Sequence, residues 1–395
     1  MINVEQAEKI VLKTTPLMSM ERVLLKNATG RILAEKITAS RNQPPFNRVA
    51  MDGIAINTET EVDELFIEGV QAAGEPQLAL NDKNNCLEVM TGSSLPKNTN
   101  CVIPYENIKI ENGIAAISKQ DIQDMQFIHP LAKDYQEGDE LLVPGIKISS
   151  AVCAIIASQG IESINVYRLP SVTVISTGTE LVELNNSILD HQIYMSNSYA
   201  IENELKGFGL TDISRVHIVD DKKVTETIIE DALNSSDIII LTGGVSKGKY
   251  DFIPECLENL KVKKQFHKIE QKPGKPMFYG TKGDKQVFAL PGNPISCLVC
   301  LRRYVTPSIL KSINSNEINV FGELQSEITF KSSFTYYVPV KAEYSELGKL
   351  MLTPIPTNGS GDFNSLGHSA GFIQLPGNKQ TFLQGESYRF YKWNS

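Results

Sequence analysis

The sequence has no apolar run that approaches the roughly 20 residues of a membrane-spanning helix. Its start, MINVEQAEKIVLKTTP, mixes acids into an apolar periodicity, so neither a signal peptide nor a membrane anchor is expected there. Concentrated positive charge is also lacking, because 38 Lys and Arg residues face 46 Asp and Glu residues, which gives a formal net charge of -8. A surface that wraps nucleic acid needs clustered cations. We therefore expect a cytoplasmic protein with no membrane or nucleic-acid partner, while a few lysines in one cleft would suffice for a small phosphorylated ligand.

Cysteine pairs are scarce: of the six cysteines, only Cys297 and Cys300 form a C-x-x-C motif. The motif lies inside the apolar stretch ISCLVCLRRYV, and neither a second pair nor nearby histidines complete a zinc site. Free cysteines are often buried. We expect two small core-facing residues one helical turn apart, with no metal or redox role.

At 395 residues the chain is long enough for roughly two to four domains. Residues 170–313 alternate β-rich runs such as SVTVIS, ISRVHIV and DIIILT with amphipathic helical patterns, and NPISCLVCLRRYVTPSILK predicts a long closing helix. This order predicts an α/β/α open-sheet domain, with the fully apolar DIIILT near its centre. Such sheets bind ligands beyond the carboxyl ends of their strands.

The segments before and after this block have a different residue pattern. Residues 46–129 and 314–395 consist of short β-like runs between turn residues, which predicts a β insertion domain and a C-terminal, barrel-like β domain. Residues 1–45 and 130–169 are more helical, and we expect them to form one elongated linker domain around the insertion. The predicted fold class is therefore a multidomain α/β protein with two small β domains.

Polar clusters follow the predicted strands of the central block. They are STGTEL with Glu180, Asp220 after SRVHIV, the glycine loop that ends in Asp251, and KPGKP with Lys272 and Lys275. Each acid alone is explained equally well as a helix N-terminal residue that the helix dipole favours. Together, acids at successive strand ends suit a divalent cation, while lysines suit phosphate or oxyanion charge. This division predicts metal-assisted phosphoryl chemistry.

The glycine loop LTGGVSKGKYDF comes close to an ATP-binding P-loop. From Gly243 it reads G-x-x-x-x-G-K, but Tyr250 stands where Ser or Thr should ligate magnesium. Lys247 and Lys249 are then more simply solvated loop charges. The pattern therefore disfavours an ATP site, and Asp251, which lies outside it, is the residue that can bind a metal ion.

Six segments in this order and spacing resemble the molybdopterin molybdenumtransferase family, which includes bacterial MoeA and the E domain of gephyrin. They are PPFNRVAMDGIAI, MTGSSLP, STGTEL, TGGVSKGKYDF, KPGKP and LPGNPIS. The resemblance spans nearly the whole chain and implies that the central domain is similar to that of molybdopterin adenylyltransferases. It also implies a homodimer with its cleft between subunits, and possible further partners in a molybdopterin adenylyltransferase and recipient molybdoenzymes.

The reaction implied by the resemblance inserts molybdate into adenylylated molybdopterin, with Mg²⁺ and with hydrolytic release of AMP. Ser246 matches a contact to the AMP phosphate, Asp251 the acid linked to hydrolysis, and Glu180 and Asp220 further carboxylates near magnesium. Asp52 and Asp134 match cleft acids, with Asp52 entering from the partner subunit. The remaining matched residues bind the substrates: Thr177, Gly178, Gly243, Gly244, Lys272, Lys275, Pro291, Pro294 and Ser296. A tetrahedral dianion needs such paired lysines and hydroxyls, and tungstate would fit them as well as molybdate.

Several positions depart from the family pattern. Thr179 and Lys249 stand where acids are common in relatives, and NRVAMDG, with Arg48, stands where DNSAMDG is typical. The segment FTYYVPV lacks the arginine that an F-x-R pattern often supplies. Ser360 and Ser365 both match the C-terminal serine-rich loop.

Two other functions remain open from the residues. An adenylyltransferase or nucleotide pyrophosphohydrolase would share the central domain, but it would not need the MDG segment or the C-terminal segments. A non-catalytic scaffold of the same fold would not need Glu180, Asp220 and Asp251, all of which are present.

Overall fold

The structure is a computed structural model that describes residues 1–245 and 252–393. The chain divides into two compact units. Unit 1 comprises Met1–Ala34, Gly145–Ser149 and Ser163–Ser395, and unit 2 comprises Glu35–Pro144 and Ser150–Glu162. Within the described residues, no helix combines the length and the apolar character that crossing a membrane requires.

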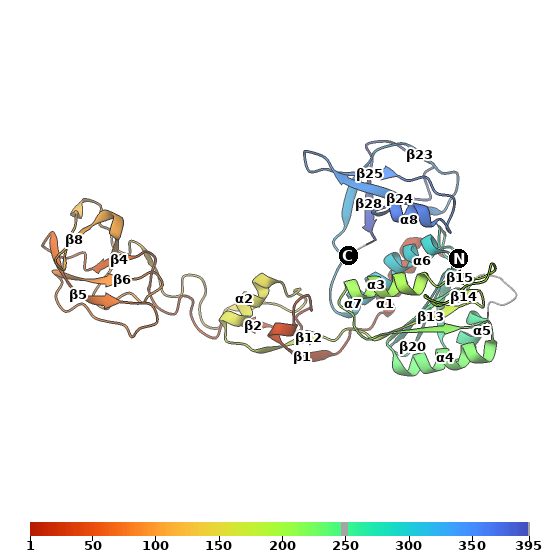
Figure 1. Cartoon of the computed structure of the whole chain (residues 1–395), viewed down its shortest axis with the longest axis horizontal. Coiled ribbons are helices and arrows are strands. Elements are labelled where there is room, and N and C mark those ends of the chain that lie inside the picture. The colour runs from red at the N-terminus through yellow and green to blue at the C-terminus, as the bar shows by residue number, and fades with distance from the viewer. Residues whose placement is uncertain (246–251, 394–395) are drawn as a thin grey trace. The chain divides into compact units, whose positions relative to one another are not determined.

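The centre of unit 1 is a six-stranded sheet in the order β16-β13-β17-β21-β20-β18. Figure 1 labels β13 and β20 of this sheet. The strands are β13 (Val172–Thr177), β16 (Ile213–Ile218), β17 (Ile238–Thr242), β18 (Lys263–His267), β20 (Phe278–Lys282) and β21 (Lys285–Leu290). The first four in spatial order run parallel, and β20 and β18 pair antiparallel to their neighbours. All five residues of β17 are buried, which confirms the central place predicted for DIIILT.

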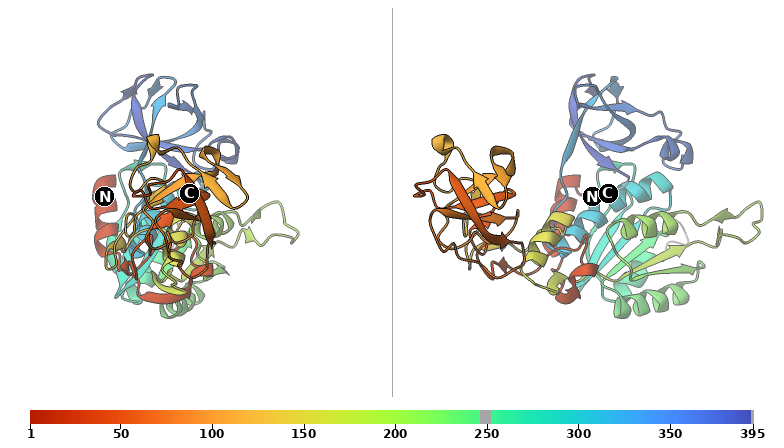
Figure 2. Two further views of the ribbon diagram at one scale, coloured as in Figure 1. Left: turned by 90° about the vertical axis from the view of Figure 1, so that its left-hand side faces the viewer. Right: turned by 60° about the vertical axis from the view of Figure 1, so that its left-hand side comes forward.

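Helices cover both faces of this sheet, so the predicted α/β/α order is confirmed (Figure 2). They are α1 (Val4–Thr14), α3 (Asn197–Gly207), α4 (Lys222–Ser235), α5 (Ile253–Asn259), α6 (Pro294–Cys300) and α7 (Thr306–Ser312). Alternate strand residues point to opposite sides: Val174 and Ile240 pack with α1, α3 and α6, whereas Ile175 and Ile239 pack with α4 and α5. The predicted closing helix runs through α6, a π-helical turn at Leu301–Val305 and α7.

Helix α1 belongs to the central core, although its sequence position lies in the predicted linker segment. Its buried residues Val4, Ala7 and Val11 join the same apolar cluster as Ile201 and Tyr304. A capping box between Asn3 and Gln6 fixes its first turn. The rest of the predicted linker contains the α-helix α2 (Ser150–Ser158) and two pairs of short strands, β1 (Met20–Leu24) with β12 (Ser163–Tyr167) and β2 (Ile37–Thr38) with β11 (Glu140–Leu142).

The C-terminal part of unit 1 closes into a small barrel. Its sheet has the order β19-β24-β25-β22-β28-β26, and a further pairing of β24 with β26 completes the ring. The elements are β19 (Gln271–Lys272), β22 (Val320–Leu324), β24 (Thr335–Tyr344), β25 (Leu350–Pro354), β26 (Gly371–Leu375) and β28 (Ser387–Lys392), with the side pair β23 (Ile328–Thr329) and β27 (Thr381–Phe382) and the helix α8 (Phe363–His368). Strand β19 comes from the central domain, so the two domains share this sheet.

Unit 2 contains a second small β domain. Its sheet has the order β7-β4-β6-β5-β9-β8 and encloses a core that includes Ile54, Leu65, Cys86 and Cys101. The elements of the unit outside the linker strands are β3 (Arg48–Val49), β4 (Gly53–Ile56), β5 (Glu64–Gln71), β6 (Asn85–Val89), β7 (Cys101–Pro104), β8 (Lys109–Glu111), β9 (Ile114–Ala116), β10 (Ile128–His129) and α2 (Ser150–Ser158). Strand β3 pairs antiparallel with β10.

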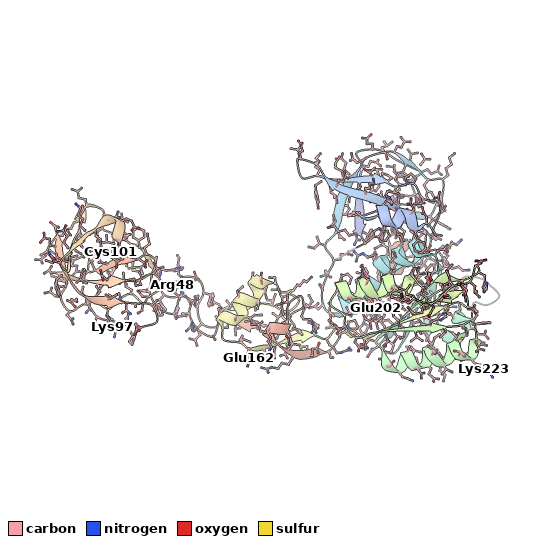
Figure 3. The ribbon with its side chains drawn as sticks, viewed as in Figure 1. Arg48, Lys97, Cys101, Glu162, Glu202 and Lys223 are labelled. Atoms are coloured by element: carbon pink, nitrogen blue, oxygen red, sulfur yellow. The ribbon has the colours of Figure 1, made fainter. Side chains whose placement is uncertain are left out.

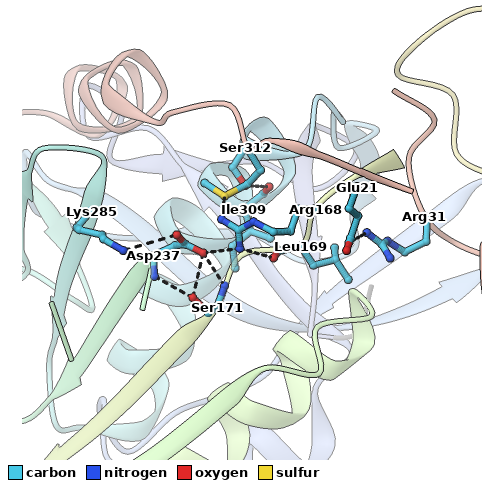
Figure 4. A network of polar contacts seen from close by, with 10 residues as sticks. Glu21, Arg31, Arg168, Leu169, Ser171, Asp237, Lys285, Ile309 and Ser312 are labelled. Atoms are coloured by element: carbon cyan, nitrogen blue, oxygen red, sulfur yellow. Dashed lines mark hydrogen bonds and ion pairs between the residues drawn. The ribbon is translucent and has the colours of Figure 1, made fainter. Parts of the chain in front are cut away.

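A polar network fastens the amino edge of the central sheet (Figure 4). Asp237 precedes β17, and its Oδ2 accepts hydrogen bonds from Arg168 Nη1 at 2.8 Å and from the amide and hydroxyl of Ser171 at 2.9 and 3.0 Å. Burial acts to raise the pKa of the Asp237 carboxyl, but these bonds outweigh it and the pKa lies below its usual range. The network fixes the starts of β13 and β17, which leaves their carboxyl ends for chemistry.

Candidate functional site

The four parallel strands of the central sheet end along one edge. The register pairs Thr177 at the end of β13 with Ile218 of β16, and Thr242 of β17 with Leu290 of β21. The predicted polar clusters therefore follow neighbouring strand ends, as the open α/β sheet requires of a ligand site.

The STGTEL turn is tied to the end of β16. The Gly178 amide donates to the Ile218 carbonyl at 3.2 Å, and the Thr179 amide and hydroxyl donate to Asp220 Oδ2 at 3.3 and 3.1 Å. His217 Nε2 lies 2.9 Å from the Gly178 carbonyl, and because a carbonyl only accepts, this nitrogen carries the proton. The structure thus brings Gly178 and Asp220 together.

Neither Glu180 nor Asp220 is a helix cap. The capping oxygen of α4 comes from Asp221, whose Oδ1 accepts from the Val224 amide at 3.0 Å. Glu180 leads into the short strand β14 (Leu181–Val182), which pairs with β15 (Ile193–Tyr194), and not into a helix. Both acids are exposed at the strand ends; the helix-dipole explanation fails for Glu180, whereas Asp220 lies one residue before the N-cap of α4.

Gly243 and Gly244 begin the glycine loop after β17 and approach β13 closely. Gly243 has φ +93°, and a Cβ added there would lie 2.7 Å from the Thr177 carbonyl oxygen and 2.8 Å from its hydroxyl. Only glycine accepts both the left-handed backbone and this approach. His267 Nε2 donates to the Val245 carbonyl at 3.2 Å, and burial lowers the pKa of this histidine.

The rest of the loop, with Ser246, Lys247, Lys249, Tyr250 and Asp251, lies outside the described residues. Residues 1–245 and 252–393 contain no group of three His, Cys, Asp or Glu side chains placed to hold a metal ion. Glu180 and Asp220 offer carboxylate oxygens, which are the donors that Mg²⁺ prefers. The chemistry of this pair fits magnesium, and the expected third ligand, Asp251, falls in the undescribed segment.

A cavity of about 470 Å³ lies between the central domain and the C-terminal barrel. Its lining includes the predicted residues Lys272, Lys275, Pro291, Ser296 and Ser360, together with Asn293, Phe334, Tyr336 and Thr357. We call it the lysine cavity. Pro294, at the first turn of α6, is not part of the lining. No Asp or Glu is among the described residues that line it, so the two ammonium groups set its charge.

The two lysines of this cavity lie over aromatic rings. Lys272 Nζ is 5.5 Å from the centroid of Phe330, and Lys275 Nζ is 5.1 Å from that of Phe334. Such contacts stabilise a cation without neutralising it. Phe334 and Tyr336 thus form a wall in the segment where the family pattern often has an arginine, a role that sequence reasoning did not assign to them.

A buried network holds the KPGKP turn. The hydroxyl of Tyr304 donates to Gln271 Oε1 at 2.5 Å, and Gln271 Nε2 donates to the Pro273 carbonyl at 3.0 Å. Cys300 Sγ contacts the Gly274 carbonyl at 3.6 Å. Cys297 and Cys300 are both fully buried, and burial raises the pKa of the Cys297 thiol to about 12. The prediction that both cysteines face the core is therefore confirmed.

Only one of the two candidate serines lines the lysine cavity. Ser360 accepts from Asn293 Nδ2 at 2.7 Å, and its carbonyl accepts from the Ile295 amide at 3.1 Å. Ser365 is fully buried, and its hydroxyl donates to the Asp362 carbonyl at 3.1 Å in the first turn of α8. The structure thus separates two residues that the sequence could not.

Asp52 and Asp134 belong to unit 2 and flank a cavity of about 360 Å³ lined by Arg48, Val49, Ala50, Thr91, Gly92 and His129. Asp52 Oδ1 accepts from the Thr91 amide at 2.6 Å, and this bond and one from the Thr91 hydroxyl lower the pKa of Asp52. Asp134 Oδ1 lies 3.0 Å from His129 Nε2. We call this space the arginine cavity; Arg48 is labelled in Figure 3.

An open α/β sheet with acids beyond its strand ends, and a cationic cavity beside it, defines an enzyme class that handles phosphate and oxyanion groups. Family models identify the lineage: the MoeA N-terminal region (domain I and II) matches residues 2–160, a probable molybdopterin binding domain matches residues 173–311, and the MoeA C-terminal region (domain IV) matches residues 322–393.

Known proteins resemble the chain over its full length. A molybdopterin molybdenumtransferase of a Synechocystis species is 37% identical over 399 residues, covering 100% of both chains. One from Bacillus subtilis is 29% identical over 381 residues, covering 93% of this chain and 88% of its own. The crystal structure of a molybdopterin biosynthesis MoeA protein from Pyrococcus horikoshii matches with a TM-score of 0.85 at 27% identity and covers 100% of this chain and 99% of its own. The chain belongs to the molybdopterin molybdenumtransferase family.

Proposed function

We propose that this protein inserts molybdate into adenylylated molybdopterin and releases AMP by hydrolysis, in the biosynthesis of the molybdenum cofactor. The observation that carries the proposal is the lysine cavity beside the acidic strand ends. Asn197 Nδ2 donates to the Gly292 carbonyl at 2.7 Å and to Thr242 Oγ1 at 3.3 Å, so the β21 loop that lines the cavity is bonded to the edge that bears the acids. The lysines suited to an oxyanion and the acids suited to a metal ion thus lie at one edge of one sheet.

The lysine cavity supplies what the oxyanion substrate needs. Molybdate is a tetrahedral dianion, and Lys272 and Lys275 offer it ammonium donors that no described carboxylate neutralises. Ser296 and Ser360 add hydroxyl groups to the same lining. Charge-assisted hydrogen bonds of this kind are roughly twice as strong as neutral ones, which favours a dianion over neutral solutes.

The acidic edge suits the phosphate half of the reaction. We assign Glu180, Asp220 and Asp251 to Mg²⁺, and Ser246, Thr177 and the backbone of Gly178, Gly243 and Gly244 to the phosphates of adenylylated molybdopterin. When bound, the ion would supply positive charge against the pyrophosphate oxygens. Thr179 already orients Asp220 through two hydrogen bonds, which leaves Asp220 Oδ1 for a further partner.

The proposal includes a cytoplasmic homodimer with the reaction cleft between its two copies. Asp52 and Asp134 would then reach the substrate from unit 2, with Asp52 contributed by the second copy. The further partners in this proposal are a molybdopterin adenylyltransferase that hands over the substrate and the enzymes that receive the finished cofactor.

The decisive experiment supplies purified protein with adenylylated molybdopterin, Mg²⁺ and molybdate, and measures AMP release and active cofactor together. Both products are expected. Because Asp251 is assigned to Mg²⁺, Asp251→Ala should abolish AMP release while thermal unfolding and the oligomeric state stay unchanged.

Two results would reject the proposal. AMP release at the full rate without molybdate would indicate a nucleotide pyrophosphohydrolase, and absence of both products would indicate a scaffold of the same fold. Asp231→Ala, which removes an exposed acid from α4, is the matched control and should retain full turnover.

A further inference from the structure

Arg48 departs in charge from the family pattern, because the segment NRVAMDG stands where DNSAMDG is typical. It lies on β3, directly opposite His129 on β10 in the antiparallel register. Side chains of directly opposed residues lie on the same face of a sheet. Arg48 Nη2 is 3.2 Å from His129 Nδ1, and both side chains line the arginine cavity.

The protonation of His129 follows from its two partners. A guanidinium only donates hydrogen bonds, so Nδ1 of His129 accepts from Arg48. The ring proton is then on Nε2, which donates to Asp134 Oδ1 at 3.0 Å. The imidazole therefore joins the Arg48 cation to the Asp134 carboxylate in one line and fixes the orientation of both groups.

The backbone beneath Arg48 is clamped from two sides. The amide of Val49 donates to the Ser93 carbonyl at 3.0 Å, and the amide of Gly92 donates to the Val49 carbonyl at 2.9 Å. On the other side, the Ala50 amide donates to the Phe127 carbonyl at 2.9 Å. A side chain on such a platform loses little freedom when it binds a ligand, so its donors are preorganised.

Most donors of Arg48 are left for a ligand. A guanidinium has five N–H groups in a fixed fork, and the hydrogen bond to His129 uses one of them. Arg48 forms no ion pair with any carboxylate in residues 1–245 and 252–393, whereas Asp134 is reached only through the histidine. A half-buried arginine on a cavity wall, without a carboxylate of its own, suits the planar bidentate recognition of a phosphate group.

We propose that Arg48 binds a phosphate group of the substrate in the arginine cavity, and that His129 and Asp134 act as positioning residues that hold its guanidinium. The inference rests on the proposed function for the identity of that phosphate, which would belong to the pyrophosphate link of adenylylated molybdopterin. Arg48 would also offset the repulsion that Asp52 and Asp134 exert on a phosphate.

The test measures the binding of inorganic pyrophosphate by calorimetry, which needs no turnover. Lys272→Ala/Lys275→Ala protein serves as the parent, so that the lysine cavity does not dominate the signal. Adding Arg48→Ser should weaken binding about tenfold or more, as loss of a charge-assisted contact predicts. Arg48→Lys should not restore it, because an ammonium group lacks the fork. Arg41→Ser removes an exposed charge from the same unit and should change affinity by less than about twofold.

The positioning role of His129 is tested by comparing two substitutions at that residue. In the same parent, His129→Gln keeps an acceptor for Arg48 and a donor for Asp134, so it should retain most of the affinity, whereas His129→Leu should lose several-fold. Equal affinity of the Arg48→Ser protein and its parent would overturn the phosphate contact, and equal affinities of the Gln and Leu proteins would overturn the positioning role. A protein that binds pyrophosphate through Arg48 but never releases AMP would reject the proposed function and leave this inference standing.

Discussion

The lysine cavity and the arginine cavity present positive charge in two different ways. In the lysine cavity, two exposed ammonium groups lie over aromatic rings, and the turn that carries them is held by buried contacts. In the arginine cavity, one planar guanidinium is held by a histidine that is itself bonded to a carboxylate. In the first arrangement the buried contacts position the backbone of the turn, and in the second the contacts position the cation itself.

This difference matches the shapes of the two proposed ligands. Molybdate is compact and close to spherical, so two point charges on flexible stems can close on it from different directions. A phosphate within a pyrophosphate link is reached from a fixed side, which favours a rigid fork. The comparison therefore predicts that changes to the lysine cavity act mainly on molybdate, whereas changes to the arginine cavity act on adenylylated molybdopterin.

The largest expected effect comes from removing the ammonium groups. Lys272→Ala and Lys275→Ala should each raise the molybdate concentration for half-maximal cofactor formation by about 10- to 100-fold, the range of a lost charge-assisted hydrogen bond. High molybdate should restore turnover, and the KM for adenylylated molybdopterin should stay within about threefold. Lys282→Ala, which removes an exposed lysine at the end of β20, is the control. A rise in both requirements would contradict the proposed separation of the two cavities.

A smaller effect should follow from disturbing the turn that carries the lysines. Gly274 has φ +93°, and a Cβ there would lie 2.5 Å from Gln271 Nε2 and 2.7 Å from Cys300 Sγ. Gly274→Ala should lower the free energy of unfolding by about 2–4 kcal/mol, as judged from left-handed strain plus overpacking. Gly283→Ala is the matched control, because Gly283 has φ +56° with open space around it, so it bears the backbone strain alone. The denaturant midpoint of the Gly274→Ala protein should therefore be lower than that of the Gly283→Ala protein. Equal midpoints would mean that the KPGKP turn accommodates the added Cβ without overpacking.

The smallest effect concerns Asp52. The Thr91 amide and hydroxyl lower the pKa of this carboxyl, so they stabilise folded unit 2 above the unfolded pKa, and that stability is lost as pH falls through the folded pKa. Thr91→Val removes the hydroxyl but keeps the amide, so the pKa should rise part of the way toward its ordinary value in a carboxyl NMR titration. Thr99→Val, which removes a hydroxyl bonded to Pro96, should leave the Asp52 titration unchanged.

The sequence predicted the parts of the molecule whose signals are local. The alternation of β13, α3, β16, α4 and β17 follows apolar periodicity, and acids after strands mark the carboxyl edge wherever the sheet is open. The two lysines of KPGKP were expected in one turn from their spacing, their common pocket was implied by the family resemblance, and both line the lysine cavity.

Long-range packing decided what the sequence left open. Helix α1 is contiguous with the linker strands, but its apolar face fits the long closing helix. Which of Ser360 and Ser365 lines the lysine cavity depends on Asp362. This residue caps α8 and accepts a hydrogen bond from the Ser365 amide, and Ser365 is buried in the first turn of that helix. Arg48 and His129 are 81 residues apart in the chain, and only the β3–β10 register reveals that they meet.

Strand β19 has a consequence for how the protein can be divided. Gln271 and Lys272 pair with Thr335 and Tyr336 of β24, so a segment of the central domain is a strand of the C-terminal sheet. A fragment that stops after the long helix would retain the acids of the carboxyl edge and Ser296, but it would lose Ser360, Phe334 and Tyr336 and the partner strand of Lys272. If the proposed function is correct, the C-terminal barrel is therefore part of the molybdate site, and the central domain alone would provide only one side of the lysine cavity.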